Sequence, residues 1–285
     1  MKNQNYLNVE SKDLCIEVSV IMAVYNTASE EILRVSINSI LNQSVNNFEL
    51  IICDDGSTDC TYETIKKITQ CDHRVILIRN VKNRGSGYAR NRCIAISRGE
   101  YIAIMDADDY SDQRRLEKQL EFLKSNPEYA FVGAKGKYFG QVNKNALEYY
   151  FYKEFPLKED FLFTLPFVHG SIMFRKCILD KFNCYREGCE VIRSEDYDLL
   201  MRLYSVGYYG ANLNEILYFI RIDENTFKRR KYRYRFTEFI VKLKGYKSLG
   251  LMPGGIFYAL KPLIVGLIPL ELLNLMKKKY YEFKS

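Results

Sequence analysis

Histidine, paired cysteines and uninterrupted apolar runs are all scarce in this chain. Only two histidines occur among 285 residues, so a catalytic dyad that pairs histidine with serine or cysteine is not expected. The eight cysteines stand singly, without a C-x-x-C pair, which argues against a zinc site or a disulfide framework. The first thirteen residues are polar. We therefore expect that the chain has no secretory signal. We also expect that its thiols are reduced and that the protein is cytoplasmic.

A glycine-rich phosphate loop is also missing. Dinucleotide-binding proteins carry G-x-G-x-x-G directly after their first strand, whereas Tyr25-Asn26-Thr27 stand at that place here. This argues against a dinucleotide oxidoreductase. Internal repeats and low-complexity tracts are absent as well. With 47% hydrophobic and 27% charged residues, the composition is that of a folded globular protein.

The formal net charge of +7 is unevenly distributed. Residues 226–285 carry 14 Lys/Arg and 3 Asp/Glu, a net of +11, whereas the rest of the chain carries 28 and 32, a net of −4. A strongly basic tail suggests an anionic partner, either a membrane or a nucleic acid. Interleaved basic and aromatic residues would suit a nucleic acid, but acidic residues gathered in the body would repel its phosphates. We therefore expect no nucleic-acid partner.

Short apolar runs rich in β-branched residues alternate with segments of helical spacing. The runs are Ile16–Val24, Phe48–Cys53, Arg74–Ile78, Tyr101–Met105 and Ala130–Ala134. Helical spacing follows candidate N-caps at Ser29 and Asp112. Farther along, Ser171–Phe174 is expected as a strand and Glu195–Val206 as a helix. The alternation predicts an α/β fold with a mostly parallel central sheet and helices on both faces.

Polar and acidic residues follow the predicted strands, at the edge where such sheets bind ligands. Tyr25 follows the first strand, Asp54-Asp55-Gly56-Ser57 the second and Asp106-Ala107-Asp108-Asp109 the fourth. Mg²⁺ and Mn²⁺ prefer a few carboxylates together with phosphate and water oxygens. In the last group, one carboxylate can bind a ribose or a metal-bound water and the other the metal. A solvated acidic turn that caps the next helix is the alternative.

Some of these residues, together with two later in the chain, are candidates for binding or proton transfer. A carboxylate of the loop Asp54-Asp55-Gly56-Ser57 can accept a hydrogen bond from a base N–H such as that of uracil, and Tyr25 can stack on or flank the same base. Asp196, at the start of a predicted helix, can serve as a general base or merely favour the helix dipole. His169 either has a structural role or orients a diphosphate or a metal.

Together these motifs resemble glycosyltransferase family 2, whose members have the GT-A fold. The resemblance covers roughly residues 18–203. The motifs that carry it are Val18–Asn26, Asp54–Asp59, Ala89-Arg90-Asn91, Gly99-Glu100-Tyr101, Asp106–Asp109, His169-Gly170-Ser171 and Glu195-Asp196. The resemblance implies a metal-dependent, inverting transfer of a sugar from a nucleotide-diphosphate donor to an acceptor hydroxyl.

The resemblance also implies roles for individual residues. Asp196 would be the catalytic base, and Asp108, Asp109 and His169 are the candidates for holding Mn²⁺ or Mg²⁺. UDP is the favoured nucleotide, with dTDP and GDP as alternatives. The residues expected to contact the nucleotide sugar are Ala23, Tyr25, Asp54, Asp55, Arg90, Asp106, Ala107 and Arg221.

One departure from the family pattern follows Arg221. Many relatives have Arg-x-His there, but Asp223 stands at the histidine position. A loop that closes over the diphosphate would therefore need another cation in place of the histidine, and Arg229 and Arg230 are the candidates.

We divide the chain into a catalytic domain, residues 1–225, and a tail, residues 226–285. The nucleotide-binding half spans about 14–135 and the acceptor half about 136–225. In the tail, a basic and aromatic run precedes an apolar stretch, Leu249–Leu270, that Lys261 and three prolines interrupt. We expect an amphipathic helical segment that lies on the membrane. A spanning helix, which needs ~20 apolar residues, and a helical hairpin packed on the body are the alternatives.

The expected partners follow from these assignments. They are a nucleotide-sugar donor, a glycan or lipid-linked acceptor in surface polysaccharide synthesis, and the cytoplasmic face of the membrane. A catalytically altered, sugar-nucleotide-binding scaffold at the membrane is the alternative function. The sequence does not define an oligomeric state.

Overall fold

The computed structural model describes residues 16–27, 29–140, 153–222 and 232–267. Within these ranges eight strands form one sheet, in the order β3-β2-β1-β4-β7-β6-β8-β5. Neighbouring strands are parallel from β3 to β4 and between β6 and β8, whereas β7 is antiparallel to both β4 and β6, and β5 to β8. The strands are β1 (Val18–Val24), β2 (Phe48–Asp54), β3 (Val75–Arg79), β4 (Tyr101–Asp106), β5 (Tyr110–Ser111), β6 (Phe131–Gly140), β7 (Met173–Arg175) and β8 (Gly210–Ile222).

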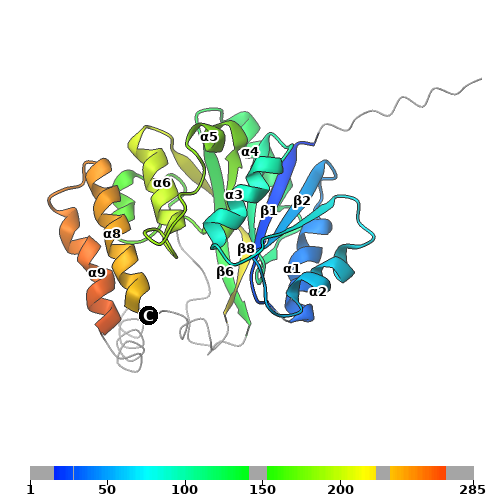
Figure 1. The fold of residues 1–285 in the computed structure, drawn as a ribbon. Coiled ribbons are helices and arrows are strands. Elements are labelled where there is room, and N and C mark those ends of the chain that lie inside the picture. The colour runs from blue at the N-terminus through cyan, green and yellow to red at the C-terminus, as the bar shows by residue number, and fades with distance from the viewer. Residues whose placement is uncertain (1–15, 28, 141–152, 223–231, 268–285) are drawn as a thin grey trace, which may run out of the picture.

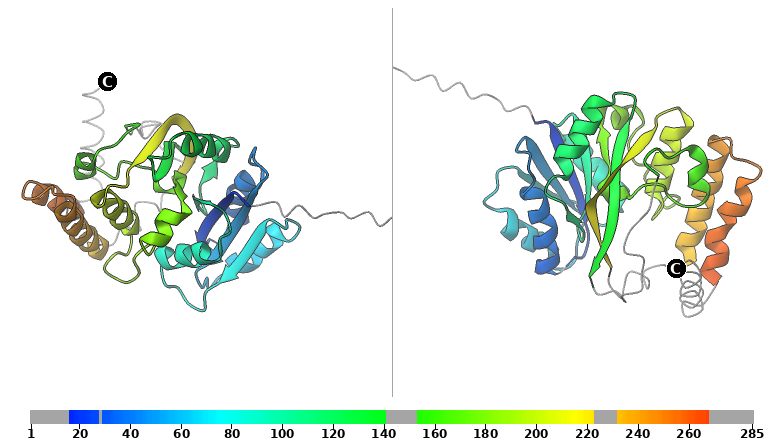
Figure 2. Two further views of the ribbon diagram at one scale, coloured as in Figure 1. Left: turned by 90° about the horizontal axis from the view of Figure 1, so that it is seen from above. Right: turned by 180° about the vertical axis from the view of Figure 1, so that it is seen from behind.

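Helices cover both faces of this sheet (Figures 1 and 2). The helices are α1 (Glu30–Leu41), α2 (Thr61–Thr69), α3 (Ser86–Ile96), α4 (Arg115–Ser125), α5 (Lys176–Lys181), α6 (Glu195–Ser205), α8 (Tyr232–Ser248) and α9 (Gly255–Leu267), with short 3₁₀ turns η1 (Lys158–Leu162) and η2 (His169–Ser171). The prediction of a mostly parallel sheet between two helical layers is confirmed.

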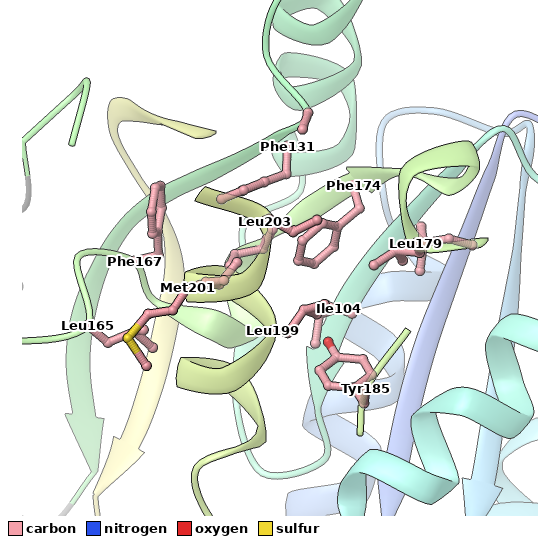
Figure 3. Packing of buried hydrophobic residues seen from close by; sticks show 14 of the residues in the cluster. Ile104, Phe131, Leu165, Phe167, Phe174, Leu179, Tyr185, Leu199, Met201 and Leu203 are labelled. Carbon is pink, nitrogen blue, oxygen red and sulfur yellow. The ribbon is translucent and has the colours of Figure 1, made fainter. Parts of the chain in front are cut away.

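Alternation along the strands produces a hydrophobic core on each face of the sheet. On β1, Val20 and Met22 belong to the cluster that includes Leu33 of α1, whereas Ile21 belongs to the cluster that includes Ala89 of α3. Successive side chains of a strand point to opposite faces, so a strand covered on both sides must be apolar throughout. Figure 3 shows the second cluster continuing among β4, β6, β7 and α6.

Local details of the fold differ from the sequence-based expectations in places. Ser29 does cap α1, accepting the N–H of Ile32 at 3.3 Å. The proposed cap at Asp112 is wrong, because α4 begins at Arg115, and the Asp112 carboxylate instead accepts the N–H of Arg114 at 2.9 Å. β7 begins two residues later than expected, because the hydroxyl of Ser171 donates to the carbonyl of Val168 and stabilises a turn there.

The described part of the tail is a helical hairpin packed on the catalytic body, which was one of the three alternatives. Tyr246 of α8 is fully buried, and its hydroxyl donates to the carbonyl of Phe161 at 2.9 Å. Gly245 contacts Met201 of α6 so closely that a side chain there would clash. In the described ranges, no helix is long and apolar enough to cross a membrane. Asp223, Arg229 and Arg230 lie outside the described residues.

Candidate functional site

A cleft of about 600 Å³ lies beyond the carboxyl ends of β1, β2 and β4. The strand register places Ala23 directly beside both Cys53 and Asp106, so the residues that follow these three positions meet at one edge. Seven residues singled out from the sequence line the cleft, namely Ala23, Tyr25, Asp55, Arg90, Asp106, His169 and Asp196. The structure therefore brings together side chains that are up to 173 positions apart in the sequence.

At one end of the cleft, the Asp55 carboxylate is fixed by the loop that follows β3. It accepts hydrogen bonds from the side-chain amide of Asn80 at 2.6 Å and from the backbone N–H groups of Arg84 and Gly85 at 3.0 and 2.7 Å. The turn at Gly56 needs glycine, because its φ is +70° and a Cβ there would lie 2.6 Å from the backbone of Lys82. These contacts position a carboxylate rigidly at the cleft wall.

A buried cation joins the two halves of the cleft. The Arg90 guanidinium lies 2.8 Å from Asp106 Oδ1 and 3.5 Å from Glu195 Oε1, and Ser86 donates to the same Glu195 carboxylate. Burial alone would lower the pKa of Arg90, but the nearby charges, with Asp106 foremost, outweigh it and raise that pKa. Arg90 is therefore a permanent positive charge between β4 and α6.

Asp196 lies at the start of α6, next to Glu195. Its carboxylate accepts the N–H of Tyr197 at 2.8 Å. Its enclosed position, together with the negative charge of Glu195, raises the pKa of Asp196 to about 7, although Arg90 acts in the opposite direction. A carboxylate with a pKa near the working pH is well suited to accept a proton from a substrate hydroxyl.

His169 contributes a neutral imidazole to the cleft. Burial and the nearby positive charge of Arg90 lower the pKa of His169 to about 3. Its Nε2 lies 2.9 Å from the hydroxyl of Tyr185. Next to it, Gly170 approaches Asp106 so closely that a Cβ would lie 2.8 Å from Asp106 Oδ2. His169 and Asp106 therefore share one end of the cleft.

The turn after β4 carries two further carboxylates, one exposed to solvent and one buried. Asp108 is exposed, and its backbone carbonyl accepts the Nε–H of Arg221 at 2.9 Å. Asp109 is buried and accepts the backbone N–H of Arg221 at 2.8 Å. Burial, followed by the charges of Asp106 and Asp108, raises the pKa of Asp109 well above its ordinary value. Arg221 thus supports this turn from β8, and does not line the cleft.

The acidic turn fits a divalent cation that takes most of its ligands from a substrate. In the part of the chain that the structure describes, no three His, Cys, Asp or Glu side chains are gathered as a complete metal site. Mg²⁺ is commonly held by one or two carboxylates plus substrate phosphates and water. The exposed carboxylate of Asp108, close to Asp106, suits that arrangement. Asp109 suits it less, because it is buried and already bonded to Arg221.

Two other candidates lie behind the cleft and not in its wall. Asp54 is fully buried, 3.0 Å from the Nε of Arg79, and accepts the N–H of Ser57. Ala107 is buried within a hydrophobic cluster. Both residues hold the loops that carry Asp55 and Asp108 in place.

Part of the cleft wall was not identified from the sequence. It comes from the loop before α6, which contributes Arg186 and Arg193, and from Tyr234 of α8. Arg186 lies 2.9 Å from Asp198, and the Arg193 guanidinium lies 5.4 Å from the centre of the Tyr234 ring. The charged residues just before Glu195-Asp196 were a usable signal for the loop. Tyr234 offered none, because only the folded chain brings α8 to the cleft.

Comparison with protein-family models places the chain beside known transferases. Residues 19–182 match the model for glycosyl transferase family 2, and residues 101–274 match that for glycosyl transferase family group 2. The chain is 37% identical over 264 residues to the putative glycosyltransferase EpsE of Bacillus subtilis, covering 92% of this chain and 94% of that protein. It is 30% identical to WfaP of Escherichia coli, covering 82% and 87%. WfaP is named a UDP-Glc:alpha-D-GlcNAc-diphosphoundecaprenol beta-1,3-glucosyltransferase.

Solved structures with the same fold include TarS 1-349 of S. aureus in complex with UDP. It superimposes with a TM-score of 0.67 at 19% identity, over 90% of this chain and 76% of that one. The mannosyltransferase PcManGT of Pyrobaculum calidifontis, in complex with GDP-Man and Mn²⁺, superimposes with a TM-score of 0.60 at 16% identity, over 94% and 81%.

Proposed function

The chain belongs to glycosyltransferase family 2 and is a glycosyltransferase, and from this premise we propose the reaction that it catalyses. It moves a sugar from a nucleotide-diphosphate donor, with UDP as the favoured nucleotide, to a hydroxyl of a lipid-linked saccharide, and inverts the anomeric carbon. The reaction serves the synthesis of a surface polysaccharide at the cytoplasmic face of the membrane. The observation that carries this proposal is the carboxylate of Asp196, with a pKa of about 7, in the same cleft as Asp55 and Asp106.

The donor binds at the end of the cleft formed by β1, β2 and β4. Asp55 accepts the N–H of the base, and Tyr25, whose side chain is 45% exposed, packs against the same base. Asp106, held by Arg90, binds the ribose or a metal-bound water. The rigid loop around Asp55 supports this assignment, because a preorganised acceptor loses little conformational freedom on binding.

The transfer is a single displacement. Asp196 takes the proton from the acceptor hydroxyl as the new bond forms between its oxygen and the anomeric carbon. The bond between that carbon and the diphosphate oxygen breaks, and the electron pair leaves with the nucleotide diphosphate. Attack from the face opposite the leaving group inverts the configuration. Base assistance of this kind is typically worth about 10²–10⁴-fold in rate.

Asp108 is the residue that would hold Mn²⁺ or Mg²⁺, with Asp106 beside it and Asp109 and His169 as the other candidates. Such an ion, when bound, neutralises the developing negative charge on the leaving diphosphate. The complex of PcManGT with Mn²⁺ supports this role for the turn. Arg90 and His169 contribute to donor binding without the ion. Arg90 fixes the carboxylate of Asp106, and the neutral imidazole of His169 can form one hydrogen bond with the nucleotide sugar.

The lipid-linked acceptor is supported by two observations. WfaP, which covers 82% of this chain, is named for a diphosphoundecaprenol-linked acceptor. In this chain, the wall of the same cleft contains Arg186 and Arg193, and guanidinium groups recognise phosphate well. The UDP donor is supported in the same way by the complex of TarS with UDP.

A screen of nucleotide sugars tests this function directly. Donor hydrolysis is measured with UDP-, dTDP- and GDP-sugars, with Mn²⁺, Mg²⁺ or EDTA, in the wild type and in Asp108→Ala. We expect metal-dependent hydrolysis of one UDP-sugar, lost in Asp108→Ala. Binding of UDP without either hydrolysis or transfer to any polyprenyl-diphosphate saccharide would instead identify a scaffold.

A further inference from the structure

We propose that the outer face of α9 is a docking surface for an anionic lipid bilayer, and that it presents the mouth of the cleft to that bilayer. The docking itself rests on the shape and charge of the α8–α9 hairpin. Only its use, which is delivery of a lipid-linked acceptor, rests on the proposed function.

The outer face of α9 is an exposed apolar stripe. Ile256, Ile264 and Leu267 are 40%, 59% and 73% exposed, and Phe257 beside them is 76% exposed. Leu260 and Leu263 lie between them at helical spacing and are half-buried. Residues separated by three, four, seven and eight positions share one side of a helix, so these side chains form one continuous surface. Figure 1 shows α9 at the outer edge of the molecule.

The inner face of the same helix carries its small residues. Gly255, Ala259 and Pro262 are the buried positions of α9, and a Cβ at Gly255 would lie 3.1 Å from the ring of Tyr246 on α8. A helix that only needed to cover the protein core would place its large apolar residues inward. Here Ile256, Phe257 and Ile264 face outward instead, which is the pattern of a surface that binds another apolar phase.

The charge of the hairpin selects the occupant. Residues 232–267 contain six Lys/Arg and one Asp/Glu, and Arg233, Lys247 and Lys261 are exposed. Lys261 belongs to α9 itself. A second copy of the chain would bring two such basic surfaces together, and their repulsion opposes a symmetric dimer. An anionic bilayer satisfies both properties, because apolar side chains enter the interface while Lys and Arg remain among the headgroups.

The stripe leads toward the cleft. Its last residue, Leu267, follows Gly266, where a Cβ would lie 3.1 Å from the side chain of Arg235 and 3.2 Å from that of Tyr232, at the start of α8. Tyr234, on the same turn of α8, lines the cleft and contacts Arg193. The end of α9 and the mouth of the cleft therefore lie at the same end of the hairpin. A saccharide anchored in the docked bilayer would enter the cleft past the contact of Tyr234 with Arg193.

Co-sedimentation with vesicles tests the proposal on the full chain. The double substitution Ile256→Glu/Ile264→Glu is compared with Ile96→Glu, a matched control at the end of α3 where the isoleucine is 43% exposed. Vesicles contain either phosphatidylglycerol with phosphatidylcholine or phosphatidylcholine alone. We expect the wild type and Ile96→Glu to bind the anionic vesicles. The affinity of the double variant for them should be lower by about tenfold or more, because each carboxylate resists transfer to the interface.

Three results would overturn the proposal. The first is equal vesicle binding by the double variant and Ile96→Glu, and the second is equal binding of the wild type to neutral and anionic vesicles. The third is that the wild type and Ile96→Glu are dimers in solution whereas the double variant is a monomer. Hydrolysis of the nucleotide sugar in detergent-free buffer keeps this test separate from the proposed function. The double variant should retain hydrolysis, since neither isoleucine lines the cleft, and a thermal melt confirms that it is folded.

Discussion

The guanidinium of Arg90, on α3, lies 2.8 Å from the carboxylate of Asp106, at the end of β4. The same cation lies 3.5 Å from Glu195, the first residue of α6. One buried charge therefore connects the strand end of the proposed donor site with the helix that carries the proposed base. Arg90 thus fixes the end of β4 and the start of α6 relative to each other.

Replacing Arg90 with methionine should damage both stability and catalysis. It would leave two carboxylates without their cation, and breaking a buried ion pair typically costs about 3–5 kcal/mol. We expect about 3 kcal/mol, since the Asp106 side chain remains 35% exposed. Urea unfolding measures this loss. Arg90→Lys keeps the charge but cannot reach both carboxylates equally well, so it should lose less stability. Equal stability of Arg90→Met and the wild type would contradict this role.

The rate of transfer should rise with pH through about 7. Asp196 must be deprotonated to accept a proton, and its pKa is about 7, so kcat/KM should fall about tenfold per pH unit below that value. Glu195 is the charge that raises this pKa most after burial. Glu195→Gln should therefore shift the acid limb to lower pH, whatever its effect on the maximal rate. An acid limb that stays in place in Glu195→Gln would exclude Asp196 as the titrating group.

Asp196→Asn should abolish transfer while stabilising the fold above neutral pH. The pKa of an aspartate in the unfolded chain is about 3.9, below its folded value of about 7. The folded state thus holds a proton that the unfolded state releases, and the free energy of unfolding falls as pH rises from about 4 to about 7. Removing the carboxylate should recover about 1–3 kcal/mol at pH 8. At pH 4 the variant and the wild type should be nearly equally stable.

Metal dependence should reside in Asp108 and not in its neighbour Asp109. Asp108→Ala should reduce transfer by about 100-fold or more and should remove the enhancement of UDP binding by Mn²⁺. Asp109→Asn keeps an oxygen that can accept the N–H of Arg221, so it should retain that enhancement. Isothermal titration calorimetry with UDP, with and without Mn²⁺, measures this enhancement in the two variants and in the wild type. The reverse pattern would assign the cation to Asp109.

Gly170 should not tolerate even a methyl group. A Cβ there would clash with the hydroxyl of Tyr218 and lie 2.8 Å from Asp106 Oδ2. The Tyr218 hydroxyl also accepts the N–H of Asp106 at 3.1 Å, so a shift of either group would displace Asp106. We expect Gly170→Ala to cost about 1–3 kcal/mol and to reduce donor affinity. Gly254→Ala is the control, because nothing lies within 4 Å of its Cβ, and it should change stability by less than about 0.5 kcal/mol.

Periodicity and strand order made much of the proposed donor side of the cleft predictable. Tyr25, Asp55 and Asp106 each follow an apolar run, and parallel strands bring their carboxyl ends to one edge. Asp54 shows the limit of that argument. It differs from Asp55 by one position, yet the turn at Gly56 directs only Asp55 to the cleft, while Asp54 pairs with Arg79. Which of two adjacent carboxylates faces a ligand depends on loop conformation, which the spacing of apolar residues does not specify.

The proposed acceptor side was less predictable, because long-range packing forms it. Arg193 lies in a loop without regular periodicity, and Tyr234 comes from a helix that returns to the cleft after β8. From the sequence, the basic and aromatic run around Tyr234 indicates an anionic partner, with a membrane favoured over a nucleic acid. In the structure the same helix also contacts the cleft and the core, a dual use that local sequence does not reveal.

The burial of Tyr246 and the contact of Gly245 with Met201 have a consequence for protein engineering. The hairpin shares its core with α6, so it is not a modular anchor that can be cut off or exchanged. A chain ending near residue 225 would uncover apolar surface on α6 and would also remove Tyr234 from the wall of the cleft. Impaired catalysis in such a truncation would carry no information about lipid attachment, and single surface substitutions on α9 are the cleaner way to dissect it.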